Sequence, residues 1–231
     1  MATSGTTTFE LDFIEAIEEA YERCGLESRS GYDMRTARRS INLMQLEWAN
    51  RGVNLWTVEE RSQLLTEADG TYQLDADIVD IIEQVVSVPN TSTVTRYNVT
   101  RVSVSTFATR TNPDIHGRPT QIYVNRKIDG PEIRLWPLPD ASGPYTLYYW
   151  VLRRIEDAGA YSNTGDFPFR FLPVFVAGLA YYLSEKKCID NPQLIERLKA
   201  RYDEQWANAA DEDRDKSTLS ITPRPGAYRT W

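Results

Sequence analysis

The sequence of 231 residues predicts an α+β protein: a four-helix bundle built from both ends of the chain, with an antiparallel β-sandwich or barrel-like domain inserted between its halves. Two observations support this prediction. Apolar residues recur at helical spacing near both ends of the chain, whereas the middle holds short, β-branched or alternating runs between turn residues. The predicted parts are a discontinuous helical bundle (residues 9–52 and 166–216), a β-rich insertion (53–165) and an extended C-terminal arm (217–231).

The first two predicted helices cover residues 9–24 and about 33–50. Gly25 follows the first apolar stripe and Gly52 follows the second, and glycine is the residue that most often ends a helix. Asp33 suits the N-cap of the second helix, because its carboxylate can accept a backbone N–H. The short link between the two helices permits an antiparallel helical hairpin.

The middle of the chain predicts a set of short strands separated by turns. Residues 137–144 contain three prolines and a glycine, which predict a rigid hairpin turn between the last two strands. The predicted strands are residues 55–58, 71–74, 78–88, 93–106, 121–126, 132–136 and 145–152.

Helical spacing returns in the last third of the chain. Pro173 suits the first turn of a helix that runs to about Lys187, because the backbone N–H groups of that turn have no partner within the helix. This segment is apolar almost all round, so we expect it to be the central helix of the bundle. A fourth helix is predicted from Asn191 to about residue 211, and the charged run 211–216 is expected to be its solvated end.

Composition and motifs predict a structural protein and not an enzyme. The net charge of −7 argues against a broad nucleic-acid-binding surface, which needs clustered lysine and arginine. With one histidine, two cysteines and only scattered glycines, the sequence predicts no catalytic triad, metal site or phosphate-binding loop, and we expect no cofactor. Cys24 and Cys188 are expected to be free thiols in a reducing compartment. We also expect no membrane span and no secretory signal.

The predicted C-terminal arm contains prolines that prevent a helix, together with side chains that often anchor interfaces. One interpretation is an ordinary terminus without fixed contacts. The other is an extended arm that becomes ordered on a partner, with the docking residues Ile221, Arg224, Tyr228, Arg229 and Trp231.

Several segments, in their order and spacing, resemble one known family. They are Tyr21-Glu22-Arg23-Cys24-Gly25, Ala37-Arg38-Arg39-Ser40-Ile41-Asn42, Leu55-Trp56-Thr57-Val58, Tyr72-Gln73-Leu74, Gly117-Arg118-Pro119-Thr120-Gln121, Leu135-Trp136-Pro137-Leu138-Pro139-Asp140 and Arg153-Arg154-Ile155-Glu156-Asp157. With these segments the chain resembles the head-to-tail adaptors of short-tailed bacteriophages, also called tail tubular or head-completion connector proteins. The resemblance extends over roughly residues 9–211.

This resemblance implies a structural virion protein at the head–tail junction, made in the host cytoplasm during assembly. It implies that about twelve copies form a ring, a dodecamer, beneath the portal protein. The expected partners are the portal, a tail nozzle or tail tube protein, and other copies of the chain. Genomic DNA is expected to pass through the lumen during ejection without specific binding, and the C-terminal arm to reach along the portal.

Closure of a ring by identical contacts requires two different, complementary faces on each subunit. The acidic face of the first helix and the arginines of the second are the predicted subunit contacts: Glu15, Glu18, Glu22, Arg35, Arg38 and Arg39. Two alternatives stay open at this point. The resemblance implies one of them, a peptidoglycan-degrading virion-associated hydrolase, because some relatives are reported to degrade peptidoglycan. No motif excludes such chemistry, since it needs only two carboxyl groups close together in the fold. The other is a different tail-side structural protein.

Overall fold

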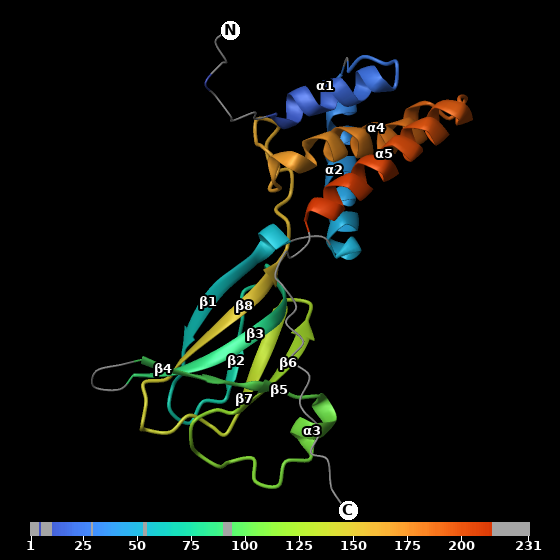
Figure 1. Ribbon diagram of the computed structural model, residues 1–231. Helices are drawn as coiled ribbons and strands as arrows, with labels where there is room; N and C mark the ends of the chain where they lie inside the picture. Colours follow the sequence, from blue (N-terminus) through green and yellow to red (C-terminus); the bar gives the residue numbers. More distant parts are fainter. Residues whose placement is uncertain (1–4, 6–10, 29, 53–54, 90–93, 214–231) are drawn as a thin grey trace, which may run out of the picture.

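The computed structural model describes residues 5, 11–28, 30–52, 55–89 and 94–213 (Figure 1). The described residues form five α-helices and two four-stranded sheets, which confirms the α+β class. Four of the helices lie together at one end of the molecule and the sheets lie at the other, as Figure 1 shows. The predicted C-terminal arm, with all five of its proposed docking residues, lies outside the described residues.

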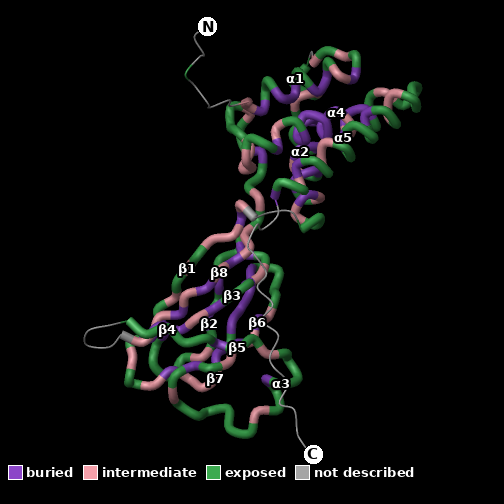
Figure 2. Tube along the Cα trace, in the orientation of Figure 1, coloured by how far each residue is buried: buried purple, intermediate pink, exposed green. Residues whose placement is uncertain are grey.

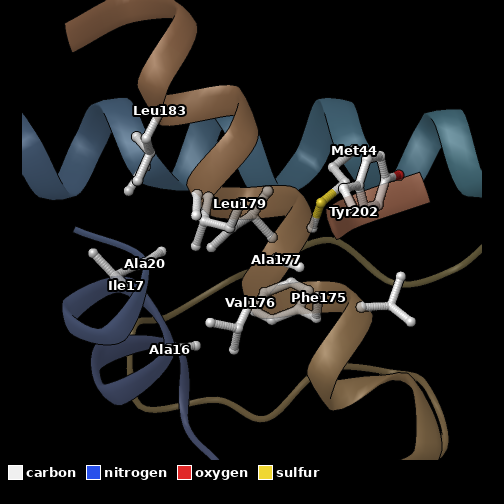
Figure 3. Close-up of a cluster of buried hydrophobic side chains, with 14 of the residues drawn as sticks. Ala16, Ile17, Ala20, Met44, Phe175, Val176, Ala177, Leu179, Leu183 and Tyr202 are labelled. Carbon is white, nitrogen blue, oxygen red and sulfur yellow. The ribbon is translucent and has the colours of Figure 1, made fainter. Parts of the chain in front are cut away.

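Four helices make up the helical part, and one buried cluster of apolar side chains lies between them. α4 contacts each of the other three, as expected of the predicted central helix. Its buried side chains lie between those of α1 and α2 in Figure 3. These helices are α1 (Phe13–Arg23), α2 (Gly31–Arg51), α4 (Leu172–Lys187) and α5 (Pro192–Glu212).

The ends of α1 and α2 follow local hydrogen-bonding rules. Ser30, and not Asp33, caps α2: the Ser30 hydroxyl accepts the Asp33 N–H at 3.3 Å and donates to the Asp33 carboxylate at 2.8 Å. The prediction of Asp33 was wrong because both residue types suit the cap position and they lie three residues apart. Gly25 and Gly52 follow their helices with φ of +70° and +75°, which confirms the predicted stops.

The link between α1 and α2 does not produce an antiparallel hairpin. α2 crosses α4 at a steep angle in both views, and α1 and α2 each pack mainly on α4 (Figures 1 and 3). The two helices meet near the link, where the Tyr21 hydroxyl donates to the Asp33 carbonyl at 3.3 Å. The short link therefore keeps the helix ends close while α4 sets their directions.

Aromatic side chains fill the centre of the helical part. Trp48 of α2 is fully buried, packs edge-on against Phe175, and donates its indole N–H to the Tyr202 hydroxyl at 2.9 Å. Gly178 allows α4 to come close to these side chains. A Cβ at Gly178 would meet Met44 Sδ at 2.5 Å and Tyr202 Cε2 at 2.8 Å, so no larger residue fits without a shift.

The β part consists of two sheets that share a second buried cluster, separate from that of the helices (Figure 2). Every strand pairing is antiparallel except that of β5 with β6. In spatial order the first sheet is β1 (Val58–Leu64), β8 (Thr146–Arg153), β3 (Ile78–Pro89) and β4 (Val94–Asn98). The second is β2 (Thr71–Gln73), β7 (Gly130–Trp136), β6 (Gln121–Lys127) and β5 (Thr100–Arg101).

Two predicted strands contain helical turns instead. Residues 55–57 form a 3₁₀ turn before β1, and there the Trp56 ring packs on Phe171 of the helical part with the ring centroids 4.8 Å apart. The predicted strand 93–106 ends early, because the Ser103 hydroxyl accepts the Thr106 N–H and caps a short helix, α3 (Val104–Ala108). Local capping and one tertiary contact therefore override the alternating pattern.

The predicted hairpin between the last two strands is also wrong. β7 and β8 belong to different sheets, and residues 137–144 carry the chain from one sheet to the other. β7 instead forms a hairpin with β6 across the tight turn between Lys127 and Gly130. The prolines make the 137–144 connection stiff, but they do not determine which strand becomes the partner.

The end of α5 is less solvated than the charge run predicts. Asp213 is only 6% exposed and pairs with Arg170, which lies in the turn before α4. This pair holds the end of α5 beside the start of α4. The remainder of the run, residues 214–216, lies outside the described part of the chain.

Candidate functional site

An acidic groove lies between α1 and the first turns of α4, with a volume of about 540 Å³. α1 buries one face against α4, so its glutamates remain on the outer face and border the apolar side chains at the start of α4. This groove, which we call the acidic groove, is lined by Leu11, Glu15, Glu18, Glu19, Glu22, Arg23, Leu172, Pro173 and Val176.

A second groove of about 490 Å³ lies between α2 and the last turn of α4. It combines basic residues with exposed apolar ones, since Tyr32 is 59% exposed and Leu43 is 54% exposed. This groove, which we call the basic groove, is lined by Tyr32, Thr36, Arg39, Leu43, Lys186 and Lys187. The two grooves therefore lie at opposite ends of the same central helix.

The acidic groove keeps most of its negative charge. Glu19 is neutralised by Arg23, with 2.8 Å between the carboxylate oxygen and Nε. Within the described part of the chain, Glu15, Glu18 and Glu22 are exposed and make no ion pair. Their side chains are thus available to a positively charged partner.

The basic groove keeps part of its positive charge. Lys187 pairs with Asp33 at 2.8 Å, but Lys186 donates only to the Ser40 hydroxyl, at 2.7 Å. Burial and the neighbouring guanidinium of Arg39 lower the pKa of Lys186. Among the described residues, neither Arg39 nor Lys186 has a carboxylate partner, so a carboxylate brought by another molecule would relieve this repulsion.

The structure brings together only part of the predicted contact set. The three predicted glutamates line the acidic groove, and Arg39 lines the basic one. Arg38 instead points to residues 154–168 between β8 and the turn before α4, which we call the crossing segment, and donates there to the Gly159 carbonyl at 3.3 Å. Arg35 is exposed elsewhere on α2. Lys186 is not among the residues predicted from the sequence, although two adjacent lysines in the last turn of an apolar helix are a visible signal.

A charged network fixes the crossing segment between the two parts. Arg153 at the end of β8 donates to Asp166 at 2.9 Å and to Glu59 of β1 at 2.5 Å. Burial alone would raise the pKa of Asp166, but hydrogen bonds from Arg153 and from the Glu156 N–H, together with the charge of Arg153, outweigh it and hold that pKa below its usual value. The Trp56 indole N–H also donates to the Asp166 carbonyl, at 2.9 Å. These hydrogen bonds connect the start and the end of the β part to Asp166 in the crossing segment.

Among the described residues, His116 and the two cysteines do not form a reaction centre. His116 is exposed in a loop, and its backbone forms an isolated bridge with Leu138. Cys24 and Cys188 are free, and burial raises the pKa of Cys24 to about 12, which disfavours the thiolate form. No cluster of histidine, cysteine and carboxylate side chains suited to a metal occurs among the described residues. None of the described helices is long and apolar enough to cross a membrane.

Comparison with known proteins identifies a family for this chain. A family model described as SU10 adaptor protein matches residues 7–227, which is nearly the whole chain. Among curated proteins, none matches.

Proposed function

Because this chain belongs to the SU10 adaptor protein family, a family of bacteriophage head-to-tail adaptors, we propose that it forms a ring beneath the portal that joins the capsid to the tail. Membership in this family makes the chain a structural component of the virion. The ring, its place below the portal and the passage of DNA through it are the parts that we propose. In this proposal the chain is not an enzyme.

The pair of charged grooves is the observation that supports ring formation best. A closed ring of identical subunits needs a heterologous contact, in which one face of each subunit meets a different face of the next. The acidic and basic grooves differ in charge, each also exposes apolar side chains, and both lie on α4. We propose that the acidic groove of one subunit meets the basic groove of the next. Of the contacts predicted from sequence, Glu15, Glu18, Glu22 and Arg39 then lie in this interface.

The two-part architecture suggests how the ring is oriented. The four helices act as one bundle that meets neighbouring subunits and the portal, and the two sheets act as one sandwich directed toward a tail nozzle or tail tube protein. The arm formed by residues 217–231 docks along the portal in this proposal. Arg35 and Arg38 are proposed to contribute at the rim of the subunit contact.

Net charge supports passage of DNA without adhesion. Each copy carries −7, so a ring of about twelve copies has a strongly negative total charge that repels phosphate where it faces the lumen. No feature of the described residues favours the peptidoglycan-hydrolase alternative, so we do not propose it.

Binding to purified portal rings tests this function. The full-length chain and a version ending at Lys216 are incubated with portal rings and analysed by sedimentation and electron microscopy. We expect the full-length chain to decorate the portal as a ring and the shortened chain to lose most of this binding. Decoration by both would retain the adaptor function and remove the arm from it. Decoration by neither would contradict the proposed function.

A further inference from the structure

A small pocket in the β part has an unusual mixture of apolar walls and guanidinium groups. It has a volume of about 280 Å³ and lies between α3, the loop that follows it, and the outer face of β6 and β7. α3 lies toward the end of the β part that is remote from the four-helix part (Figure 1). The pocket, which we call the α3 pocket, is lined by Val104, Phe107, Ala108, Arg110, Pro113, Tyr123 and Arg134.

The sheet and α3 together build a rigid wall for this pocket. Tyr123 and Arg134 are directly paired across β6 and β7, so their side chains lie on the same face of the sheet. Phe107 of α3 is buried against Tyr123, with the ring centroids 5.6 Å apart. The loop after α3 is fixed to the same sheet, because the Trp136 indole N–H donates to the Asn112 carbonyl at 2.8 Å.

Arg110 brings to this pocket a guanidinium without a carboxylate partner among the described residues. Its guanidinium lies 3.9 Å from the centre of the Phe107 ring, and one Nη donates to the Phe107 carbonyl at 3.1 Å. Its Nε is buried and has no acceptor among the described residues, and no carboxylate there pairs with the guanidinium. The guanidinium lines the pocket and keeps its charge, so its outer nitrogens favour a ligand that supplies an oxygen, and a carboxylate most of all.

The other pocket residues indicate what flanks that oxygen. Arg134 gives its Nε to Glu132 at 2.9 Å, and its side chain is 47% exposed, so its outer nitrogens remain accessible. Val104 is 60% exposed at the edge of the pocket, beside the rings of Phe107 and Tyr123. A ligand that suits these surroundings has a carboxylate at its centre and apolar groups on either side.

We propose that the α3 pocket binds an extended protein segment that carries a carboxylate side chain between apolar residues. Resting on the proposed function, this segment belongs to the tail-side partner of the ring. A peptide suits the pocket better than a phosphate group of nucleic acid for two reasons. A phosphate would leave the apolar residues at the edge of the pocket uncovered. The chain as a whole is also negatively charged, which disfavours binding of nucleic acid.

Nuclear magnetic resonance of the full-length chain tests the proposal directly. The probe is the acetylated and amidated tripeptide Leu-Glu-Leu, and its control is Leu-Gln-Leu, which has the same shape without the charge. We expect Leu-Glu-Leu to shift the Nε–H signal of Arg110 and to bind at least about tenfold more tightly than the control. Equal binding of the two peptides, or an equal shift caused by inorganic phosphate, would overturn the proposal.

Matched variants separate the pocket from the rest of the fold. Arg110→Gln is expected to abolish the peptide effect, whereas Arg118→Gln is expected to leave it unchanged. Arg118 is a suitable control because it also lies over an aromatic ring, that of Tyr97 at 3.7 Å, but outside the pocket. Val104→Ser is expected to weaken binding severalfold without touching any guanidinium. Loss of binding in the Arg118 variant, or retention in the Arg110 variant, would contradict the assignment.

The role at the tail is tested separately from the role at the portal. Rings of the Arg110→Gln variant are expected to decorate portals normally but to capture far fewer tails than rings of the original chain. Normal tail capture by this variant would overturn the tail-side assignment. Failure of the original chain to decorate portals would count against the proposed function, and the peptide experiment would still decide the pocket.

Discussion

The charged networks of the β part and the two grooves of the helical part differ in how many of their charged side chains form ion pairs. In the β part, Asp80 accepts hydrogen bonds from both Arg101 and Arg126, and Glu132 accepts from Lys127 and Arg134. In the helical part, the charges of the two grooves remain largely without ion-pair partners in the described chain.

This difference separates two roles of charge. Pairs inside the β part stabilise the subunit itself, whereas unpaired charges bordered by exposed apolar side chains stabilise nothing until a partner arrives. We therefore expect substitutions of paired charges to change stability, and substitutions in the grooves to change assembly.

Removing the aromatic centre of the helical part tests whether the two cores are separate. Trp48→Ala is expected to cost about 3–5 kcal/mol of unfolding free energy, because it leaves a large cavity and an unpaired Tyr202 hydroxyl. Ile133→Ala, in the β core, is the matched control and is expected to cost about 2–5 kcal/mol. Urea unfolding followed by circular dichroism should show each variant shifting a different transition. A single shared transition would show that the cores unfold as one unit.

Breaking the network at the junction tests what couples the two parts. Arg153→Met is expected to cost about 2 kcal/mol, because Asp166 loses its charged donor and Glu59 keeps only Arg61. Both carboxyl groups have pKa values below their usual range in the folded protein, so their contribution is present at neutral pH and is lost as the pH falls through the folded pKa.

The matching measurement is thermal unfolding of both proteins between pH 7 and pH 3. The original chain should lose stability more steeply below about pH 4 than the Arg153 variant, since the variant no longer has the pairs of Arg153 with Asp166 and Glu59. Parallel pH curves for the two proteins would contradict this role of the network.

Neutralising one acid in each part tests whether paired charges act in stability and unpaired charges act in assembly. Asp80→Asn is expected to lower stability by about 1–2 kcal/mol, because hydrogen bonds from Arg101 and Arg126 outweigh burial and hold the Asp80 pKa low. It should leave portal decoration unchanged. Glu18→Gln should do the reverse, with unchanged stability and weaker decoration. Equal effects of both variants on stability would refute the separation of roles.

Of the substitutions expected to change the stability of the subunit, that of Lys186 has the smallest expected effect. Burial and Arg39 lower its pKa, so its charged form costs stability in the free subunit at every pH below its unfolded pKa, and the cost disappears above that pH. Lys186→Met is therefore expected to raise stability by less than about 1 kcal/mol at pH 7 while weakening ring formation. Destabilisation of the free subunit, measured by urea unfolding, would show that the ammonium group is structural instead.

Sequence reasoning predicted the fold where local signals and burial agree. The stops at Gly25 and Gly52, the proline in the first turn of α4 and the start of α5 after Asn191 all follow from backbone chemistry that acts within a few residues. The errors arose where a distant contact decides. Trp56 turns toward Phe171, and the 137–144 connection joins two sheets, and neither partner is visible in a local pattern.

Only part of the candidate site could be predicted from the sequence, for a similar reason. The glutamates of α1 recur on one helical face, so their common surface follows from spacing alone. The basic groove combines α2 with the last turn of α4, more than a hundred residues later in the chain, and depends on the steep crossing of these helices. Only the fold reveals that Lys186 joins Arg39 while Arg38 points elsewhere.

Exchanging charges between the two grooves tests whether the acidic groove of one subunit meets the basic groove of the next. One variant carries Glu15→Lys and Glu18→Lys, and the other carries Arg39→Glu and Lys186→Glu. Each alone is expected to fail to form rings on purified portals, because one contact in every pair of neighbours becomes repulsive. An equal mixture is expected to restore rings, since alternating subunits then present opposite charges at every contact. Rings formed by either variant alone, or no rings from the mixture of folded subunits, would contradict the claim that the acidic groove meets the basic groove.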